Sequence, residues 1–313
     1  MGAIMCKKNA IRRRSSDFQR APTPQPRAGV RAVAAIALLM SAGWGCADAA
    51  ASGARATAPA AGIRIVATDG VFEAPHRVAA GLRHIVFENH GKHQHEAMLV
   101  KLPEGMTPEG YFAAVHGGNT FPEGALDYSG AGLTAPGESV EIWVRVDPGH
   151  YMVVCWNGNH PTARFAHRLT VVADGTPDDP APKEDVVLRL TDYHFELDRA
   201  IEKGQRVIRV ETPGPSMHEV DVFRMRGDAS IADLERWYEE EDHDRPHTRP
   251  TPADGMGGMS DSHDIHRIGW MRRNFAPGRY VFTCHLPLPR AGKDSPKLSH
   301  ADAGMIKEVV VAP

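Results

Sequence analysis

Short apolar runs rich in β-branched and aromatic residues recur along most of the chain, and Gly, Pro and Asp residues separate them. This alternation is typical of strands joined by turns. It predicts strands in the first half at 63–68, 84–88, 140–146 and 151–155, and in the second half at 185–190, 206–210, 280–284 and 308–311. Many short strands of this kind favour an all-β protein built as a Greek-key sandwich.

Two segments, 107–115 and 230–238, interrupt the strand pattern with helical signals. In the second, Ser230 with Asp233 three residues later is typical of a helix N-cap followed by an acid in the first turn. The two segments occupy corresponding places in the two halves of the chain. We therefore expect one helical insertion in each half.

The two halves repeat one another in sequence. At an offset of 123 residues, Thr68-Asp-Gly-Val-Phe72 matches Thr191-Asp-Tyr-His-Phe195, and His95-Glu96 matches His218-Glu219. At an offset of 129, Pro148-Gly149 matches Pro277-Gly278 and Cys155 matches Cys284. Such self-similarity indicates a duplicated domain. The predicted organisation is a first copy over 62–173, a proline-rich acidic linker over 174–184 and a second copy over 185–313.

The first 50 residues have the pattern of an export signal. A basic stretch ends at Arg31, an apolar run follows over 33–40, and Ala47-Asp-Ala49 has the form that signal peptidase accepts. Cys46 offers an alternative ending, in which a lipidated cysteine anchors the protein to a membrane. No apolar run reaches the ~18–20 residues that span a bilayer. We expect an exported protein, periplasmic or extracellular, in an oxidising compartment, with membrane attachment only through Cys46.

The net charge of −3 conceals two unlike parts. Residues 1–46 carry eight basic side chains and one acidic one, so the rest holds 28 basic and 38 acidic residues, a net charge of −10. An acidic body argues against a nucleic-acid partner, because binding nucleic acid requires a basic face. A hydrophobic content of 42% is sufficient for a packed core.

The second copy offers one early histidine and a cluster of soft or borderline ligands near its end: His218, Cys284, His300 and Met305. Two imidazoles, a thiolate and a thioether are the ligand set that favours a blue-copper electron-transfer site. Glu219 and its first-copy counterpart Glu96, next to histidines, are candidates to orient the ligand rings.

Both copies resemble cupredoxin domains of the plastocyanin and azurin type. The first carries Asn89-His-Gly-Lys-His-Gln-His95-Glu, which resembles the Asn-to-His ligand segment of that family. The second carries Pro277-Gly-Arg-Tyr280, Cys284 and His300-Ala-Asp-Ala-Gly-Met305, which resemble its Pro-Gly-x-Tyr, Cys and His-to-Gly-Met signature. The resemblance implies two tandem cupredoxin-like Greek-key β-sandwiches with copper as cofactor. Fifteen residues separate Cys284 from His300, a longer ligand loop than the family usually has.

In the first copy the corresponding set is His95, Cys155, His160 and His167, with no methionine. Counting back from the last predicted strand puts His167 at the place of Met305. This set could bind copper or zinc with a histidine in the axial position, or it could be a decayed site. A disulfide between Cys155 and Cys284 is the structural alternative for the two thiols.

One further segment, Met256-Gly-Gly-Met259-Ser-Asp-Ser-His263-Asp-Ile-His266, has the soft ligands of a Cu(I) carrier. Its glycines make a surface loop the favoured interpretation.

The resemblance implies an exported copper protein that transfers single electrons through the second-copy site, rather than an enzyme. Two alternatives stay open. The first is a copper oxidoreductase of the two-domain nitrite-reductase kind, which uses Cys284-His285 to reach a second metal. The second is a non-redox protein, either a copper storage or delivery protein or a degenerate cupredoxin scaffold. The acidic body favours a redox partner protein with a basic docking patch.

Overall fold

The computed structural model describes residues 62–116, 122–157, 162, 164–214, 216–239, 250–262, 268–288 and 298–313. The predicted leader with Cys46 lies outside these ranges, and so does His160. The described residues all belong to one compact unit, Thr57–Pro313. Within those ranges, the helices are too short or too polar to cross a membrane.

The first copy is a two-layer sandwich whose strands bury alternate side chains. In β7, Val140, Ile142, Val144 and Val146 all face the core, as a strand with one buried face requires. The first-copy elements are β1 (Ile63–Ala67), β2 (Phe72–Glu73), β3 (Arg77–Ala79), β4 (Gly81–Asn89), β5 (His95–Leu102), α1 (Pro108–His116), β6 (Leu126–Thr134), β7 (Ser139–Val146), β8 (Gly149–Val154) and β9 (His167–Val172).

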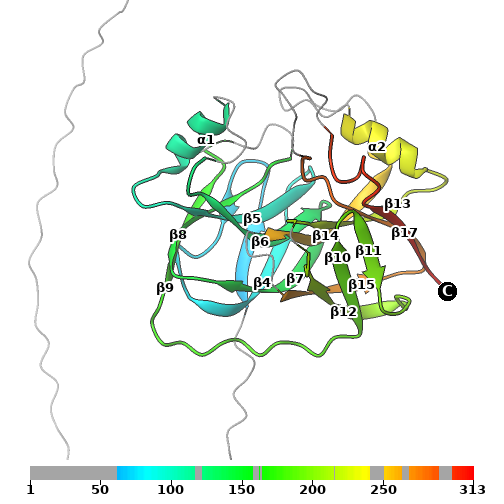
Figure 1. Cartoon of the computed structure of the whole chain (residues 1–313), viewed down its shortest axis with the longest axis horizontal. Coiled ribbons are helices and arrows are strands. Elements are labelled where there is room, and N and C mark those ends of the chain that lie inside the picture. Colours follow the sequence, from blue (N-terminus) through cyan, green and yellow to red (C-terminus); the bar gives the residue numbers. More distant parts are fainter. Residues whose placement is uncertain are drawn as a thin grey trace, which may run out of the picture. The chain divides into compact units, whose positions relative to one another are not determined.

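The second copy repeats this order, except that no strand in its described residues corresponds to β3. Its elements are β10 (Val186–Thr191), β11 (His194–Leu197), β12 (Gly204–Glu211), β13 (Val220–Met225), α2 (Ile231–Glu239), β14 (Ala253–Ser262), β15 (Ile268–Phe275), β16 (Gly278–Thr283) and β17 (Ile306–Val311). The prediction of an all-β fold with one helical insertion in each half is confirmed. Figure 1 labels these insertions α1 and α2.

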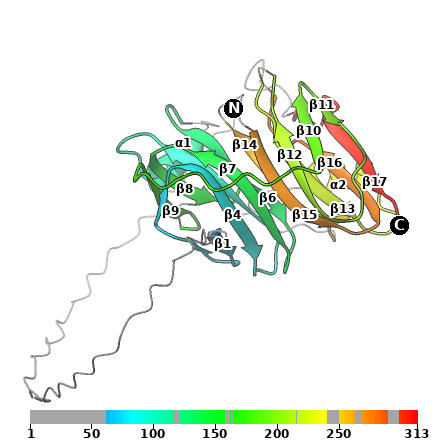
Figure 2. The same ribbon diagram turned by 90° about the horizontal axis from the view of Figure 1, so that it is seen from below.

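Both sheets run through both copies. One sheet has the order β11-β10-β12-β15-β7-β4-β1-β2, and the other has the order β17-β16-β13-β14-β6-β5-β8-β9-β3. The copies therefore meet where β7 pairs with its counterpart β15, and where β6 pairs with its counterpart β14. Figure 2 shows the strands continuing from β4 and β7 into β15 and β12.

The pairing register at this junction has the symmetry of a two-fold axis. Ile142 lies opposite Met271, and Ala131 lies opposite Met259. The pairing within each copy shows that Ile142 and Met271 are equivalent positions of the two copies, and so are Ala131 and Met259. Equivalent residues that pair with one another are the mark of an isologous interface.

The glycine-rich segment of the second copy is a central strand, not a surface loop, and that interpretation of the sequence was wrong. Met256 and Met259 are buried in the main core, where β14 lies between β13 and β6. A Cβ atom at Gly258 would overlap the carbonyl oxygen of Val220, so the strands approach too closely for a larger residue. The glycines therefore permit close strand packing.

Each helix covers a small core of its own on the outer face of the nine-stranded sheet. Tyr111 and Phe112 of α1 pack on Met98 and Val154, while Leu234 of α2 belongs to a separate cluster. The predicted N-cap of α2 is present: the backbone N–H of Ser230 donates to Asp233 Oδ2 at 2.9 Å, and the N–H of Asp233 donates to Ser230 Oγ at 3.2 Å. This reciprocal pair satisfies donors that a helix start leaves unbonded.

Candidate metal centre

Three of the four predicted second-copy ligands converge at one end of the sandwich. His218 precedes β13, Cys284 follows β16, and His300 lies in the turn before β17. The Nδ1 atoms of His218 and His300 are 3.1 Å apart, and Cys284 Sγ lies 3.4 Å from His300 Nδ1. All three residues are buried. The strand ends thus bring together groups that are far apart in sequence.

The fourth, Met305, is fully buried and tied to the same centre through its main chain. Its N–H donates to the carbonyl oxygen of His300 at 2.9 Å, and its own carbonyl accepts the N–H of Cys284 at 3.2 Å. The turn between His300 and Met305 closes at Gly304, whose φ of 103° favours glycine. Backbone hydrogen bonds therefore fix Met305 relative to both other residues.

An aspartate, not the adjacent glutamate, holds the ring of His218. Asp192 Oδ1 lies 3.2 Å from His218 Nε2, so the Nε2–H group donates to the carboxylate and Nδ1 keeps a lone pair for a metal ion. Glu219, which the sequence suggested for this role, instead accepts the backbone N–H of His285 at 2.8 Å.

The first copy repeats this arrangement. Asp69 Oδ1 lies 3.2 Å from His95 Nε2, and Glu96 accepts the backbone N–H of Trp156 at 2.6 Å. Sequence reasoning missed both aspartates as orienting residues. The signal was present, because each belongs to the Thr-Asp pair that the two copies share.

Burial favours the neutral form of both second-copy imidazoles. It lowers the pKa of His218 and of His300 below the ordinary value, and the Asp192 carboxylate only partly opposes this. Metal ions bind the neutral imidazole, so these rings need not lose a proton first. The ring of Tyr193 stands edge-on to His300 at a centroid distance of 5.1 Å and covers it from one side.

The spacing of the donors fits a metal ion. Two imidazole nitrogens at ~2.0–2.1 Å and a thiolate at ~2.3 Å from one ion are typical of such sites in proteins. If the angle at the ion is roughly 100–120°, two such nitrogens lie about 3.1–3.6 Å apart, and a nitrogen and the sulfur lie about 3.3–3.8 Å apart. The observed separations of 3.1 and 3.4 Å agree with this arithmetic. His218, Cys284 and His300 can thus bind one ion without large movement.

The first-copy set is differently placed. Cys155 Sγ lies 3.9 Å from His95 Nδ1, and both residues are fully buried. His167 does not join them in a ligand cluster within the described residues. Its ring stacks on His76 at a centroid distance of 4.5 Å, and its Nε2 lies 3.2 Å from the carbonyl oxygen of Pro75.

The strand register explains this difference. Val153 pairs with His167 in the first copy, and the equivalent Phe282 pairs with Lys307 in the second. His167 therefore corresponds to Lys307, and Phe165 stands at the place of Met305. The ring of Phe165 stacks on His95 at a centroid distance of 5.5 Å. His160 lies outside the described residues.

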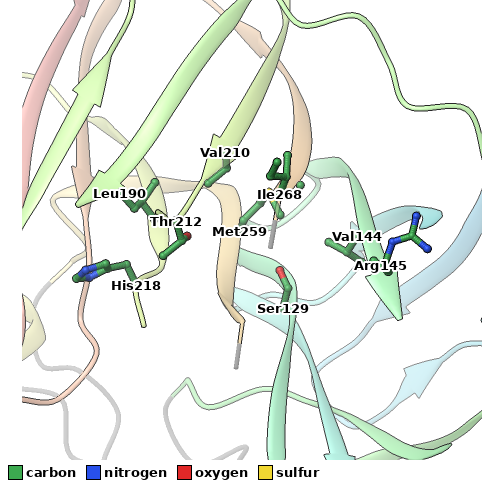
Figure 3. Close-up of a pocket in the computed structure, with 10 residues that line it drawn as sticks. Ser129, Val144, Arg145, Leu190, Val210, Thr212, His218, Met259 and Ile268 are labelled. Atoms are coloured by element: carbon green, nitrogen blue, oxygen red, sulfur yellow. The ribbon is translucent and has the colours of Figure 1, made fainter. Parts of the chain in front are cut away.

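The two cysteines are both thiols, so the alternative of a disulfide between Cys155 and Cys284 is not realised. A small cavity of about 20 Å³ lies beside the second-copy centre. Figure 3 shows His218 and Leu190 at one end of it and Ser129 with Val144 and Arg145 toward the other. Its lining thus includes residues of both copies.

Neither a protein-family model nor a curated protein sequence matches the chain. Among solved structures, the chain is similar to reduced auracyanin from Roseiflexus castenholzii, with 19% sequence identity and a TM-score of 0.25. The match covers 35% of this chain and 95% of that one. A blue copper oxidase from Nitrosomonas europaea has 12% identity, a TM-score of 0.22 and coverage of 79% and 85%. A copper-containing nitrite reductase from Thermus scotoductus has 11% identity, a TM-score of 0.22 and coverage of 80% and 65%.

Proposed function

We propose that the protein binds copper at His218, Cys284 and His300, with Met305 as a weak axial ligand, and serves as a one-electron carrier. The observation that carries the proposal is the convergence of two imidazole nitrogens and one thiol sulfur. The nitrogens are 3.1 Å apart, the sulfur lies 3.4 Å from that of His300, and the ligand atoms of all three residues lie within 4.8 Å of one another. This donor set, with a nearby methionine, favours copper in a blue-copper site over zinc or calcium. Bound copper would supply a Cu(I)/Cu(II) couple at this position.

The chain's own residues suit electron transfer rather than ligand exchange. The donors are shielded from water, and main-chain hydrogen bonds connect Cys284, His300 and Met305. Glu219 N–H also points at Cys284 Sγ, at 3.5 Å. Hydrogen bonds around a cysteine sulfur tune the potential of such centres. A centre that is already assembled changes little in structure when its charge changes by one.

Copper titration of the mature protein tests the proposal. We expect an intense visible thiolate-to-copper band at one copper per chain, which Cys284→Ser abolishes. The matched variant Cys155→Ser, in the first copy, should keep the band. In Met305→Leu the band should remain while the reduction potential changes, because an axial thioether tunes the potential.

A colourless protein whose melting temperature does not respond to copper would contradict the proposal. More than one copper per chain together with turnover of nitrite or oxygen would instead favour the two-domain oxidoreductase. Copper bound without a visible band would favour storage or delivery.

We further propose that the carrier is exported and exchanges electrons with a protein that presents a basic docking patch. The export pattern of the first 50 residues and the net charge of −10 on residues 47–313 support this. Electron exchange with a basic partner should slow steeply as salt is added, because screening weakens attraction between exposed charges. A rate independent of salt would argue against electrostatic docking.

A further inference from the structure

A second cluster of ligand groups lies beside the first, on the opposite face of the same two strand ends. A carboxylate oxygen of Glu219, one of Asp221 and a ring nitrogen of His285 lie within 4.8 Å of one another. Glu219 directly follows His218, and His285 directly follows Cys284. Consecutive residues in extended chain point to opposite faces. The thiolate centre thus faces the sandwich core, whereas this cluster lies on the side that α2 covers.

The members of the cluster are held in place by specific contacts. Glu219 accepts the backbone N–H of His285 at 2.8 Å, and Asp221 accepts the N–H of Leu133, from the first copy, at 3.0 Å. The His285 ring stacks on Tyr238 of α2 at a centroid distance of 3.8 Å. A carboxylate can accept more than one hydrogen bond, so the bond from Leu133 leaves Asp221 with acceptor capacity.

Two groups in the cluster are buried at a cost: within the described ranges, Asp221 has a hydrogen bond but no cation beside it, and one ring nitrogen of His285 has no hydrogen bond. Asp221 is only 9% exposed and forms no ion pair with any residue that the structure describes. His285 Nδ1 is shielded from solvent and has no hydrogen-bond partner in the described part of the chain. Burying a carboxylate without a cation, or a ring nitrogen without a bond, costs free energy. A cation bound among the three residues would compensate the buried carboxylate.

The first copy shows that the fold does not require these groups. Glu96 makes the same backbone bond as Glu219, but Met98 and Trp156 stand where Asp221 and His285 stand in the second copy. There they belong to or pack against an apolar cluster beneath α1. Apolar side chains are therefore sufficient for folding at these two positions, yet the second copy carries two ionisable groups there.

We propose that Glu219, Asp221 and His285 form a second metal site, which takes a divalent ion of the zinc class. Imidazole nitrogen together with carboxylate oxygen is a ligand combination for Zn²⁺. The imidazole disfavours Ca²⁺ and Mg²⁺, and the absence of sulfur among these three ligands disfavours Cu(I). Two carboxylates around one divalent ion leave little net charge in the partly buried site. The site does not depend on what the thiolate centre binds.

Zinc binding to the full mature chain tests the proposal, with Cys284→Ser as background so that the thiolate centre contributes little. Equilibrium dialysis should give one zinc ion per chain that is lost, or bound at least about tenfold more weakly, when His285→Gln or Asp221→Asn is added. The control is Glu96→Gln in the same background. It removes the matching first-copy carboxylate, near which Met98 and Trp156 stand in place of Asp221 and His285, and should leave zinc uptake unchanged.

Anomalous X-ray scattering from zinc-soaked crystals should place the ion between Glu219, Asp221 and His285. Equal zinc uptake in the background protein and in both added variants would overturn the proposal, as would an ion located elsewhere. Should His285→Gln fail to fold, Asp221→Asn and the scattering decide. The Asp221→Asn single variant should keep the visible copper band. This result would show that the zinc site can fail while the proposed copper function holds.

Discussion

A single hydrogen bond decides which nitrogen of His218 faces the metal centre. With Nε2–H donating to Asp192 at 3.2 Å, the ring presents the lone pair of Nδ1 toward His300 and Cys284. The carboxylate is partly exposed, so its value lies in fixing the tautomer and the ring orientation more than in charge.

Removing this carboxylate should weaken metal binding. We expect Asp192→Ala to lower the copper affinity of the second copy about 10–100-fold, as loss of such outer partners typically does. Competition titration against a chelator measures the change. The matched variant Asp69→Ala, behind His95, should leave that affinity unchanged. Equal affinities for wild type and Asp192→Ala would show that the backbone alone positions the ring.

A buried carboxylate far from the metal centre makes stability depend on pH. Asp127 in β6 is 3% exposed, one of its oxygens has no partner among the described residues, and burial raises its pKa to about 7. Below its usual pKa the group is neutral in both states. Between about pH 4 and 7 the folded chain binds more protons than the unfolded one, so stability falls as pH rises.

Asp127→Asn should therefore stabilise the protein above about pH 7 and have little effect near pH 4. The rise in the pKa of Asp127 corresponds to a gain of at most about 4 kcal/mol in the free energy of unfolding. Urea unfolding at the two pH values measures the difference. A gain that is the same at both would mean that the carboxylate is not protonated in the folded state.

At the scale of elements, close strand packing rests on a pair of equivalent glycines. A Cβ at Gly258 would overlap the carbonyl oxygen of Val220, and one at Gly130 would overlap that of Ala97. Because the obstacle is backbone, it cannot move aside as a side chain would. We expect Gly258→Ala and Gly130→Ala each to cost about 1–3 kcal/mol of unfolding free energy.

Chemical denaturation of these variants checks the cost. Gly70→Ala serves as control, since nothing lies within 4 Å of a Cβ there and its φ is not positive. A Gly258→Ala protein as stable as this control would show that β13 and β14 can separate freely.

The element scale also shows how far sequence reasoning reaches. Strand texture and the internal repeat predicted the all-β fold, and the order of His218, Cys284 and His300 predicted a cluster that the structure brings together. Register could not be counted from sequence, so Phe165 rather than His167 stands at the place of Met305. The sequence did not reveal that β14 is a strand, because a glycine-rich composition is typical of loops. In β14 the glycines instead allow neighbouring backbones to approach closely.

At the scale of the whole molecule, the two copies depend on each other for sheet continuity. Arg272 and Arg273 of β15 form ion pairs of 3.0 and 2.9 Å with Glu141 and Glu138 of the first copy. Arg273 is only 5% exposed, so separation of the copies would leave a buried charge without its partner. It would also open an edge on each sheet.

A fragment of residues 185–313 should therefore not be a stable monomer. Because the junction pairs equivalent residues, the exposed edges of β14 and β15 are complementary to themselves. We expect the fragment to form a symmetric dimer that repeats the junction, or to aggregate. Sedimentation equilibrium distinguishes these species. A monodisperse monomer with full secondary structure would contradict the expectation.

The pairing of Ile142 with Met271 and of Ala131 with Met259 has a consequence for how such a chain arises and changes. It is the symmetry that a homodimer interface has, and joining two such subunits end to end would preserve it. Joining replaces association between separate molecules by an intramolecular step, so assembly no longer depends on protein concentration. It also allows the two halves to differ in amino-acid sequence. One half can hold Phe165 and Trp156 where the other holds Met305 and His285, an asymmetry that no homodimer of a single gene product can encode.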